Sequence, residues 1–119
     1  MALLQATYRD AGVVTVLDLS GRITLGEGSA LLRSTIRELL ADQRVRILVN
    51  LGDINYIDSS GIGELVSAYT AVKNRGGELK LLNLTKKVRD LLQITKLYTV
   101  FDVHTDEVTA LRSFNNTTV

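Results

Sequence analysis

The sequence of 119 residues contains no cysteine, and this absence excludes several kinds of site at once. Without thiols the chain cannot form disulfides, use a thiolate as a nucleophile or build a cysteine-ligated zinc site. A chain of this length can bury roughly two thirds of its unfolded surface, so it needs no such crosslink to fold. The lack of cysteine agrees with a reducing compartment, and we expect a cytoplasmic protein that needs neither metal nor cofactor.

Proline is absent as well, and long hydrophobic runs are missing. Glycines and short polar clusters must therefore separate the structural elements. No segment approaches the roughly 18 to 20 apolar residues that span a bilayer. Residues 1–9 also lack the basic and apolar regions of a signal peptide. We expect no membrane insertion and no export.

Charge of neither sign dominates, because 14 basic residues face 13 acidic ones and the net charge is +1. Proteins that bind nucleic acid usually concentrate positive charge on one face or arm. The short basic cluster Lys86-Lys87-Val88-Arg89 is followed directly by Asp90, which is typical of a solvated helix start. We therefore expect no direct binding of nucleic acid.

The apolar pattern predicts a single α/β domain over residues 1–119, with its core at about residues 7–114 and a flexible tail at residues 115–119. The predicted strands are Thr7–Asp10, Val13–Ser20, Ile47–Leu51, Glu78–Leu82 and Tyr98–Val103. The first two should form a hairpin. Because the later strands alternate with helices, we expect right-handed crossovers and a mixed, mostly parallel sheet of about five strands with four helices.

Four helices are predicted by apolar residues that repeat along one face. The first follows a glycine-punctuated connection from Gly21 to Gly28. The second starts around Asp58 to Gly61 and ends at Gly76-Gly77. Thr85 should cap the third helix and Thr105 the last.

The most informative segment is Asn50-Leu-Gly-Asp-Ile-Asn-Tyr-Ile-Asp-Ser-Ser-Gly-Ile-Gly63, which should run from a buried strand through a polar loop into a helix. Sites in open α/β sheets favour the carboxyl ends of strands. Either Asp58 or Ser59 can accept hydrogen bonds from the free N–H groups of the first helical turn, and such caps are common in proteins without a site. Ser60 is followed three residues later by Gly63, so no capping box explains the serine pair.

A hydroxyl at the start of a helix is also suited to phosphorylation. The phosphate would gain from the helix dipole and add about −1.5 to −2 charges at pH 7. Asp58 opposes this by repulsion between like charges. A partner docked over the helix would then bury an unpaired charge at a cost of several kcal/mol, enough to change its occupancy by orders of magnitude.

The same segment resembles the central signature of STAS domains in bacterial anti-sigma factor antagonists. The resemblance extends from about Val13 to Phe114 and includes Lys73-Asn-Arg-Gly-Gly-Glu-Leu and Val88-Arg-Asp-Leu-Leu. It implies a STAS fold and a non-catalytic, phosphorylatable protein that binds partners. In that family the serine directly after the aspartate, by match Ser59, is phosphorylated by a kinase that is also an anti-sigma factor.

The resemblance further implies partner switching. The unphosphorylated domain binds the anti-sigma factor and frees sigma, phosphorylation breaks that complex, and a PP2C-type phosphatase restores it. The expected partner-binding residues are Asp58, Ser59, Ser60, Gly61 and Gly63, with Thr24 and Arg22 on the rim. The sequence leaves open whether the protein also forms a homodimer.

One departure from the family concerns the turn after the second strand. Well-studied antagonists carry an aspartate there that helps to engage the kinase, whereas Gly21-Arg22-Ile23-Thr24 puts Thr24 at this position. The departure indicates a changed partner surface. It keeps an alternative open, in which the domain is a STAS scaffold or a transport-associated subunit that is not regulated by phosphorylation.

Two further alternatives find little support in the sequence. A serine nucleophile would need a base, the only histidine is His104, and the Gly-x-Ser-x-Gly elbow is absent. Gly61-Ile-Gly63 is too short for a dinucleotide-binding fingerprint, and no P-loop is present. We therefore expect a binding protein rather than an enzyme.

Overall fold

The computed structural model of the chain describes residues 4–115. Its elements follow the predicted order of strands and helices: β1 Leu4–Ala11, β2 Val14–Ile23, α1 Glu27–Ala41, β3 Arg46–Ile57, α2 Ser59–Asn74, β4 Glu78–Leu82, α3 Lys86–Ile94, β5 Val103–His104 and α4 Glu107–Asn115. The predicted five strands and four helices are thus confirmed. Residues 116–119, which belong to the predicted tail, lie outside the described residues.

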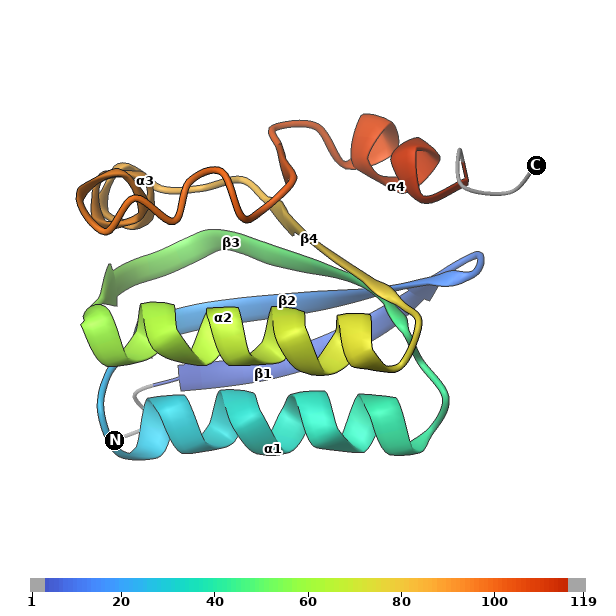
Figure 1. The fold of residues 1–119 in the computed structure, drawn as a ribbon, viewed down its shortest axis with the longest axis horizontal. Coiled ribbons are helices and arrows are strands. Elements are labelled where there is room, and N and C mark those ends of the chain that lie inside the picture. The colour runs from blue at the N-terminus through green and yellow to red at the C-terminus, as the bar shows by residue number, and fades with distance from the viewer. Residues whose placement is uncertain (1–3, 116–119) are drawn as a thin grey trace.

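The sheet has the strand order β1-β2-β3-β4-β5. β1 and β2 form the predicted antiparallel hairpin, and the other neighbouring pairs are parallel. Helices α1 and α2 lie side by side along the sheet, and α3 and α4 are drawn above the strands in Figure 1, near opposite ends of the molecule. The mixed, mostly parallel sheet predicted from the alternation of strands and helices is confirmed.

Two apolar clusters hold the layers together. In the larger one, the sheet residues Leu17, Val49 and Leu81 pack with side chains from α1, α2 and α3. In the smaller one, Val16 and Leu48 pack against Ala110 and Phe114 of α4, on the opposite face of the sheet. The nearly continuous apolar character of β3 follows from this arrangement, because a central strand covered on both faces buries successive side chains.

The strands around the predicted site are longer than the sequence indicates. β2 continues to Ile23, so the predicted connection from Gly21 begins inside a strand. The predicted polar loop after Leu51 is also wrong, because β3 continues to Ile57 beside the end of β2. Two irregularities in the β2–β3 register allow this pairing. Because of these irregularities, buried and exposed residues no longer alternate with a period of two, and the sequence pattern does not predict a strand here.

The predicted last strand, Tyr98–Val103, is shortened to Val103–His104. The preceding residues form turns, and of their side chains Val100 and Phe101 pack on the core whereas Tyr98 is exposed. Phe101 contacts the ring of Tyr69 on α2 edge to face, with 5.5 Å between ring centroids. The aromatic and β-branched composition that predicted a strand therefore serves packing here.

Two helix caps were predicted after β4, and one of them is wrong. The hydroxyl of Thr85 accepts the N–H of Val88 at 3.5 Å, as expected for the cap of α3. At the start of α4, Asp106 rather than Thr105 takes this role. Its carboxylate accepts the N–H of Thr109 at 2.9 Å and the hydroxyl of the same residue at 2.8 Å.

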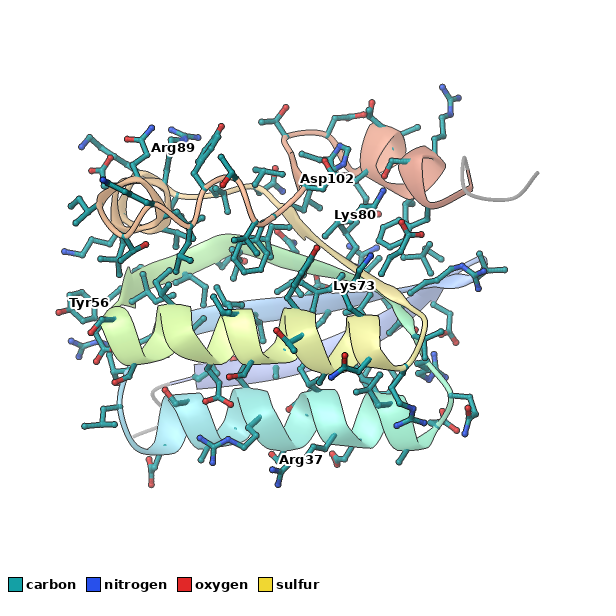
Figure 2. All side chains as sticks on the ribbon, in the orientation of Figure 1. Arg37, Tyr56, Lys73, Lys80, Arg89 and Asp102 are labelled. Carbon is teal, nitrogen blue, oxygen red and sulfur yellow. The ribbon has the colours of Figure 1, made fainter. Side chains whose placement is uncertain are left out.

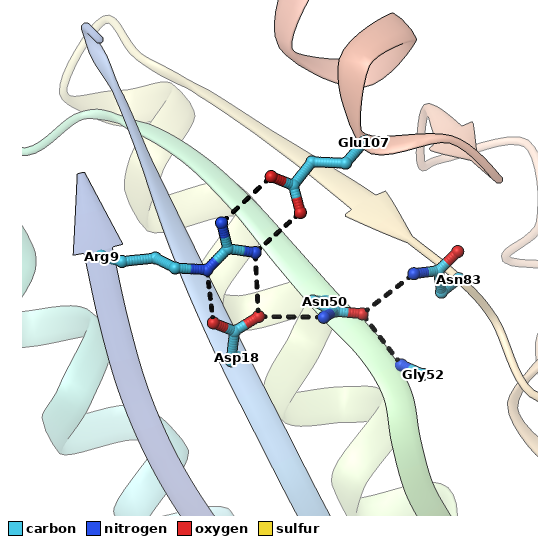
Figure 3. Close-up of polar contacts among 6 residues, drawn as sticks. All are labelled: Arg9, Asp18, Asn50, Gly52, Asn83 and Glu107. Atoms are coloured by element: carbon cyan, nitrogen blue, oxygen red, sulfur yellow. Dashed lines mark hydrogen bonds and ion pairs between the residues drawn. The ribbon is translucent and has the colours of Figure 1, made fainter. Parts of the chain in front are cut away.

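A polar network fastens α4 to the sheet (Figure 3). Arg9 on β1 contacts Asp18 on β2 at 2.8 Å and Glu107 on α4 at 2.7 Å. Asn50 on β3 donates to Asp18 at 2.9 Å and accepts from the amide of Asn83 at 3.3 Å. The network thus joins four elements across the face of the sheet beside α4.

The network also sets the charge state of its two carboxyl groups. Burial acts to raise the pKa of Asp18, but the hydrogen bonds from Arg9 and Asn50 outweigh it and hold that pKa below its usual value. The hydrogen bonds from Arg9 also lower the pKa of Glu107, against a smaller opposing effect of burial. Both groups are therefore more acidic in the folded protein than in the unfolded chain.

Candidate functional site

Asp58 lies between the end of β3 and the start of α2, and its carboxylate joins two segments. One oxygen accepts the N–H of Gly61 at 2.9 Å and thereby caps α2. The other oxygen accepts the N–H of Leu25 at 3.1 Å, in the loop between β2 and α1. The sequence left either Asp58 or Ser59 as the cap, and the structure assigns that role to Asp58. The contact with Leu25 had no signal in the sequence.

Gly61 is buried where the first turn of α2 meets the end of β2. A Cβ at this position would lie 2.3 Å from the carbonyl oxygen of Ile23 and 2.7 Å from a side-chain carbon of Ile57. The chain itself therefore fills the space that the missing side chain leaves, and this space is not open to a partner. At the exposed Gly63 a Cβ would meet nothing within 4 Å, so close approach of a partner stays a prediction there.

Ser59 is the first residue of α2 and its side chain is exposed. Within residues 4–115, no hydrogen bond engages its hydroxyl, whereas Ser60 beside it is half-buried. The first N–H groups of a helix lack partners within the helix and carry the positive end of its dipole. The Ser59 oxygen can therefore accept a phosphoryl group without breaking an existing contact, in a position that favours negative charge.

The loop after β2 forms the neighbouring part of this surface. The backbone carbonyl of Thr24 accepts two hydrogen bonds from Ser29, from its N–H at 3.0 Å and from its hydroxyl at 2.9 Å. These bonds fix the start of α1. The side chain of Leu25 extends into solvent and is 78% exposed. Because Asp58 holds the backbone of Leu25, the exposed leucine and the start of α2 belong to one ordered surface.

Arg22 lies near the end of β2 and contacts an aromatic side chain, while its role at the rim of a partner surface stays a prediction. Its guanidinium lies 5.1 Å from the ring centroid of Tyr56, which is its register partner on β3. The ammonium of Lys87 on α3 lies 4.9 Å from the same centroid. Figure 2 shows Tyr56 at the end of the molecule where α2 begins. The cluster of Arg22, Tyr56 and Lys87 was missed by the sequence reasoning, which placed Tyr56 in a loop.

The single histidine is not arranged as a catalytic base. One ring nitrogen of His104 contacts both Asp102, at 3.0 Å, and the hydroxyl of Ser113, at 3.5 Å. A catalytic triad needs these two contacts on different nitrogens. The hydroxyl of Ser113 also donates to the carbonyl of Ala110 at 2.6 Å, so its proton is directed away from His104. This geometry does not support a serine nucleophile at Ser113.

Residues 4–115 contain neither a metal-binding cluster nor a membrane-spanning helix. This part of the chain holds no group of three or more histidine or acidic side chains arranged to bind a metal ion. None of its helices is long and apolar enough to cross a membrane.

The family model of the STAS domain matches residues 5–110, nearly the whole described chain. The chain belongs to the STAS domain family. This STAS domain is 39% identical over 64 residues to the anti-sigma-B factor antagonist of Bacillus subtilis. The match covers 54% of this chain and 59% of that protein, so it spans less than two thirds of the relative's length.

Solved structures agree with the fold. An anti-sigma factor antagonist from Mycobacterium paratuberculosis superimposes on this STAS domain with a TM-score of 0.83 at 20% identity, covering 94% of both chains. The Bacillus cell fate determinant SpoIIAA in its phosphorylated form gives a TM-score of 0.71 at 19% identity, covering 92% of this chain and 98% of that one. At these identities the likeness concerns the fold alone.

Proposed function

We propose that this STAS domain is an anti-sigma factor antagonist that binds a kinase-type anti-sigma factor and is switched off by phosphorylation of Ser59. The observation that carries the proposal is the exposed hydroxyl of Ser59 at the first residue of α2, which no hydrogen bond engages within residues 4–115. The name of the Bacillus subtilis relative supports the antagonist role. The phosphorylated form of SpoIIAA supports a phosphate switch on this fold.

In the unphosphorylated state the partner covers the start of α2 and the adjoining loop. Leu25, exposed over 78% of its surface, supplies apolar contact area, and Gly63 offers no side chain that would hold the partner away. Asp58 keeps both segments in one arrangement, which reduces the conformational entropy that binding would otherwise cost. Ser60 lies half-buried in the first turn of α2. The backbone carbonyl of Thr24 accepts the hydroxyl of Ser29 and so holds the loop against the start of α1.

Phosphorylation transfers a phosphoryl group from ATP to the Ser59 oxygen, with release of ADP and of the hydroxyl proton. The new group carries about −1.5 to −2 charges at pH 7. Under a docked partner this charge would be buried without a counter-ion, and such burial costs several kcal/mol. The anti-sigma factor therefore dissociates, and hydrolysis by a PP2C-type phosphatase restores the binding form. This role requires no catalysis by the domain, no cofactor and no nucleic acid, and it belongs in the cytoplasm.

Three variants test the proposal. Each variant serves as bait, and the amount of anti-sigma factor that it retains from an extract of the protein's own cells is measured. We expect Ser59→Ala to retain a kinase-type anti-sigma factor and Ser59→Asp to lose it by tenfold or more. Ser67→Asp is the matched control, because Ser67 is exposed on the same helix and receives the same charge further from the cap. Equal retention by Ser59→Asp and Ser59→Ala would overturn the switch.

Thr24 favours a second candidate function. A threonine supplies no charge at the position where the family's aspartate helps to engage the kinase. In this second role the domain is a constitutive scaffold or a transport-associated subunit. Its sign would be a stable complex with a partner other than a kinase, unaffected by the substitutions at Ser59.

A further inference from the structure

Two positive side chains lie over the ring of Tyr56, three residues before Ser59, without an acidic partner among residues 4–115. Arg22 and Lys87 are exposed, and over residues 4–115 neither forms an ion pair. Both are held against the ring of Tyr56, at 5.1 Å and 4.9 Å from its centroid. Cation–π contacts orient the two cations but leave their charges uncompensated. An anion that approached both would compensate these charges.

The chain path brings Ser59 close to this pair. Arg22 is aligned with Tyr56 in the parallel register of β2 and β3, and Ile23 is aligned with Ile57. The N–H of Asp58 then donates to the carbonyl of Ile23 at 3.3 Å, which keeps the start of α2 beside the end of β2. Ser59 follows Tyr56 by only three residues, which limits the distance between their Cα atoms to about 11 Å. This is comparable with the Debye length of about 8–10 Å at ordinary salt.

We infer that Arg22 and Lys87, positioned by Tyr56, form a binding site for a phosphate monoester dianion attached to Ser59. The inference rests on the proposed phosphorylation of Ser59. When the phosphate is present, the two cations turn towards it and cancel most of its charge. Phosphorylation then changes the surface twice, because it adds a bulky anion to the start of α2 and withdraws two cations from the face offered to a partner.

The two cations also offset the repulsion between the Asp58 carboxylate and the phosphate. The Asp58 carboxylate lies next to Ser59 in the chain and repels a phosphate there, while its oxygens are occupied by the N–H groups of Gly61 and Leu25. Free N–H groups at a helix start bind phosphate in proteins generally, so they would also contact a phosphate on Ser59. The contribution of Arg22 and Lys87 is specific to this chain and can be separated from that general effect by substitution.

The test uses the full-length protein with phosphoserine incorporated at position 59 during translation, so that no kinase is needed. Titration by phosphorus NMR gives the second pKa of the phosphate. We expect Lys87→Gln and Arg22→Gln each to raise this pKa by roughly 0.5–1 unit, because each removes a nearby positive charge. Tyr56→Leu should raise it by a smaller amount, and Tyr56→Phe, which keeps the ring, should leave it unchanged.

Lys86→Gln is the matched control. Lys86 precedes Lys87 on the same helix, and its ammonium is already paired with Asp90 at 2.7 Å. We expect this substitution, which removes the same formal charge, to leave the phosphate pKa unchanged. An equal effect of Lys86→Gln and Lys87→Gln, or no effect of any variant, would overturn the inference. Failure of the proposed function would appear separately, as absence of phosphate on Ser59 in protein taken from cells.

Discussion

Gly61 is the residue at which the geometry of the Ser59 surface is most tightly constrained. Its missing Cβ allows the carbonyl oxygen of Ile23 to approach to a distance that no other residue would permit. The same carbonyl accepts the N–H of Asp58, the residue that caps α2. Close packing at Gly61 and capping by Asp58 therefore fix the position of Ser59 together.

We predict that Gly61→Ala lowers the free energy of unfolding by about 2–3 kcal/mol, because the added methyl group collides with backbone. Gly63→Ala is the matched control in the same helix. A Cβ there meets nothing within 4 Å, so alanine should leave the stability unchanged or raise it by up to about 1 kcal/mol. Urea denaturation of the three proteins measures these differences. Equal stability of Gly61→Ala and the original protein would contradict the packing described here.

Single residues at the site were predictable where a local rule applies. The free N–H groups of a helix start restricted the cap of α2 to Asp58 or Ser59, and the structure assigned it to Asp58. Tyr56 and Lys87 were missed because their contact joins β3 to α3, far apart in the sequence. The contact of Arg22 with Tyr56 depends in addition on the register of β2 and β3. No local pattern carries that information.

At the scale of elements, α4 is attached to the sheet by the smaller apolar cluster and by the network around Arg9. The ion pairs of this network are partly exposed, with 46% of the Arg9 side chain accessible. Exposed pairs contribute at most about 1 kcal/mol each. Apolar packing of Phe114 and Ala110 therefore provides most of the attachment, and the network adds a dependence on pH.

The lowered pKa values of Asp18 and Glu107 predict the sign of that dependence. Both groups bind protons more weakly in the folded protein, so their contribution is complete above the unfolded-state values of about 4. It is lost as the pH falls through the lower folded-state values. Arg9→Gln should therefore reduce the loss of stability between about pH 5 and pH 2. Thermal melts over this range measure the effect.

Arg37→Gln is the control for this prediction, because it removes one exposed positive charge from α1 that has no ion pair among residues 4–115. Its melting temperatures should follow those of the original protein at each pH. An acid dependence of Arg9→Gln as steep as that of Arg37→Gln would show that Arg9 does not set the two pKa values.

The elements themselves were predictable to different degrees. The alternation of strands with helices was sufficient to predict the order of the elements and the mixed sheet. The capping residues were sufficient to predict where α2 and α3 begin. The extension of β3 was not predictable, because Leu51, Ile54 and Ile57 are all buried at a spacing of three residues. Register irregularities produce that spacing, and they arise only when β2 is paired beside it.

The whole molecule places its proposed docking surface at one end. Residues 4–115 extend over 41 × 28 × 23 Å, and Figure 1 shows the start of α2 at one end of the longest dimension. The carboxyl ends of the parallel strands β2 and β3 meet there, where sites in open α/β sheets are concentrated. A partner bound at this end would leave α4 and its polar network uncovered. The proposed phosphate switch would therefore act on docking without disturbing the core.

The central claim is that Ser59 is phosphorylated in the cell, and it is tested most directly by mass spectrometry of the intact protein isolated from its own cells. Fragmentation then assigns any phosphate to a residue. We predict a population that carries one phosphate, located on Ser59, in growing or stressed cells. Persistent absence of phosphate under both conditions, or a phosphate on another residue alone, would contradict the switch and favour a constitutive binding module.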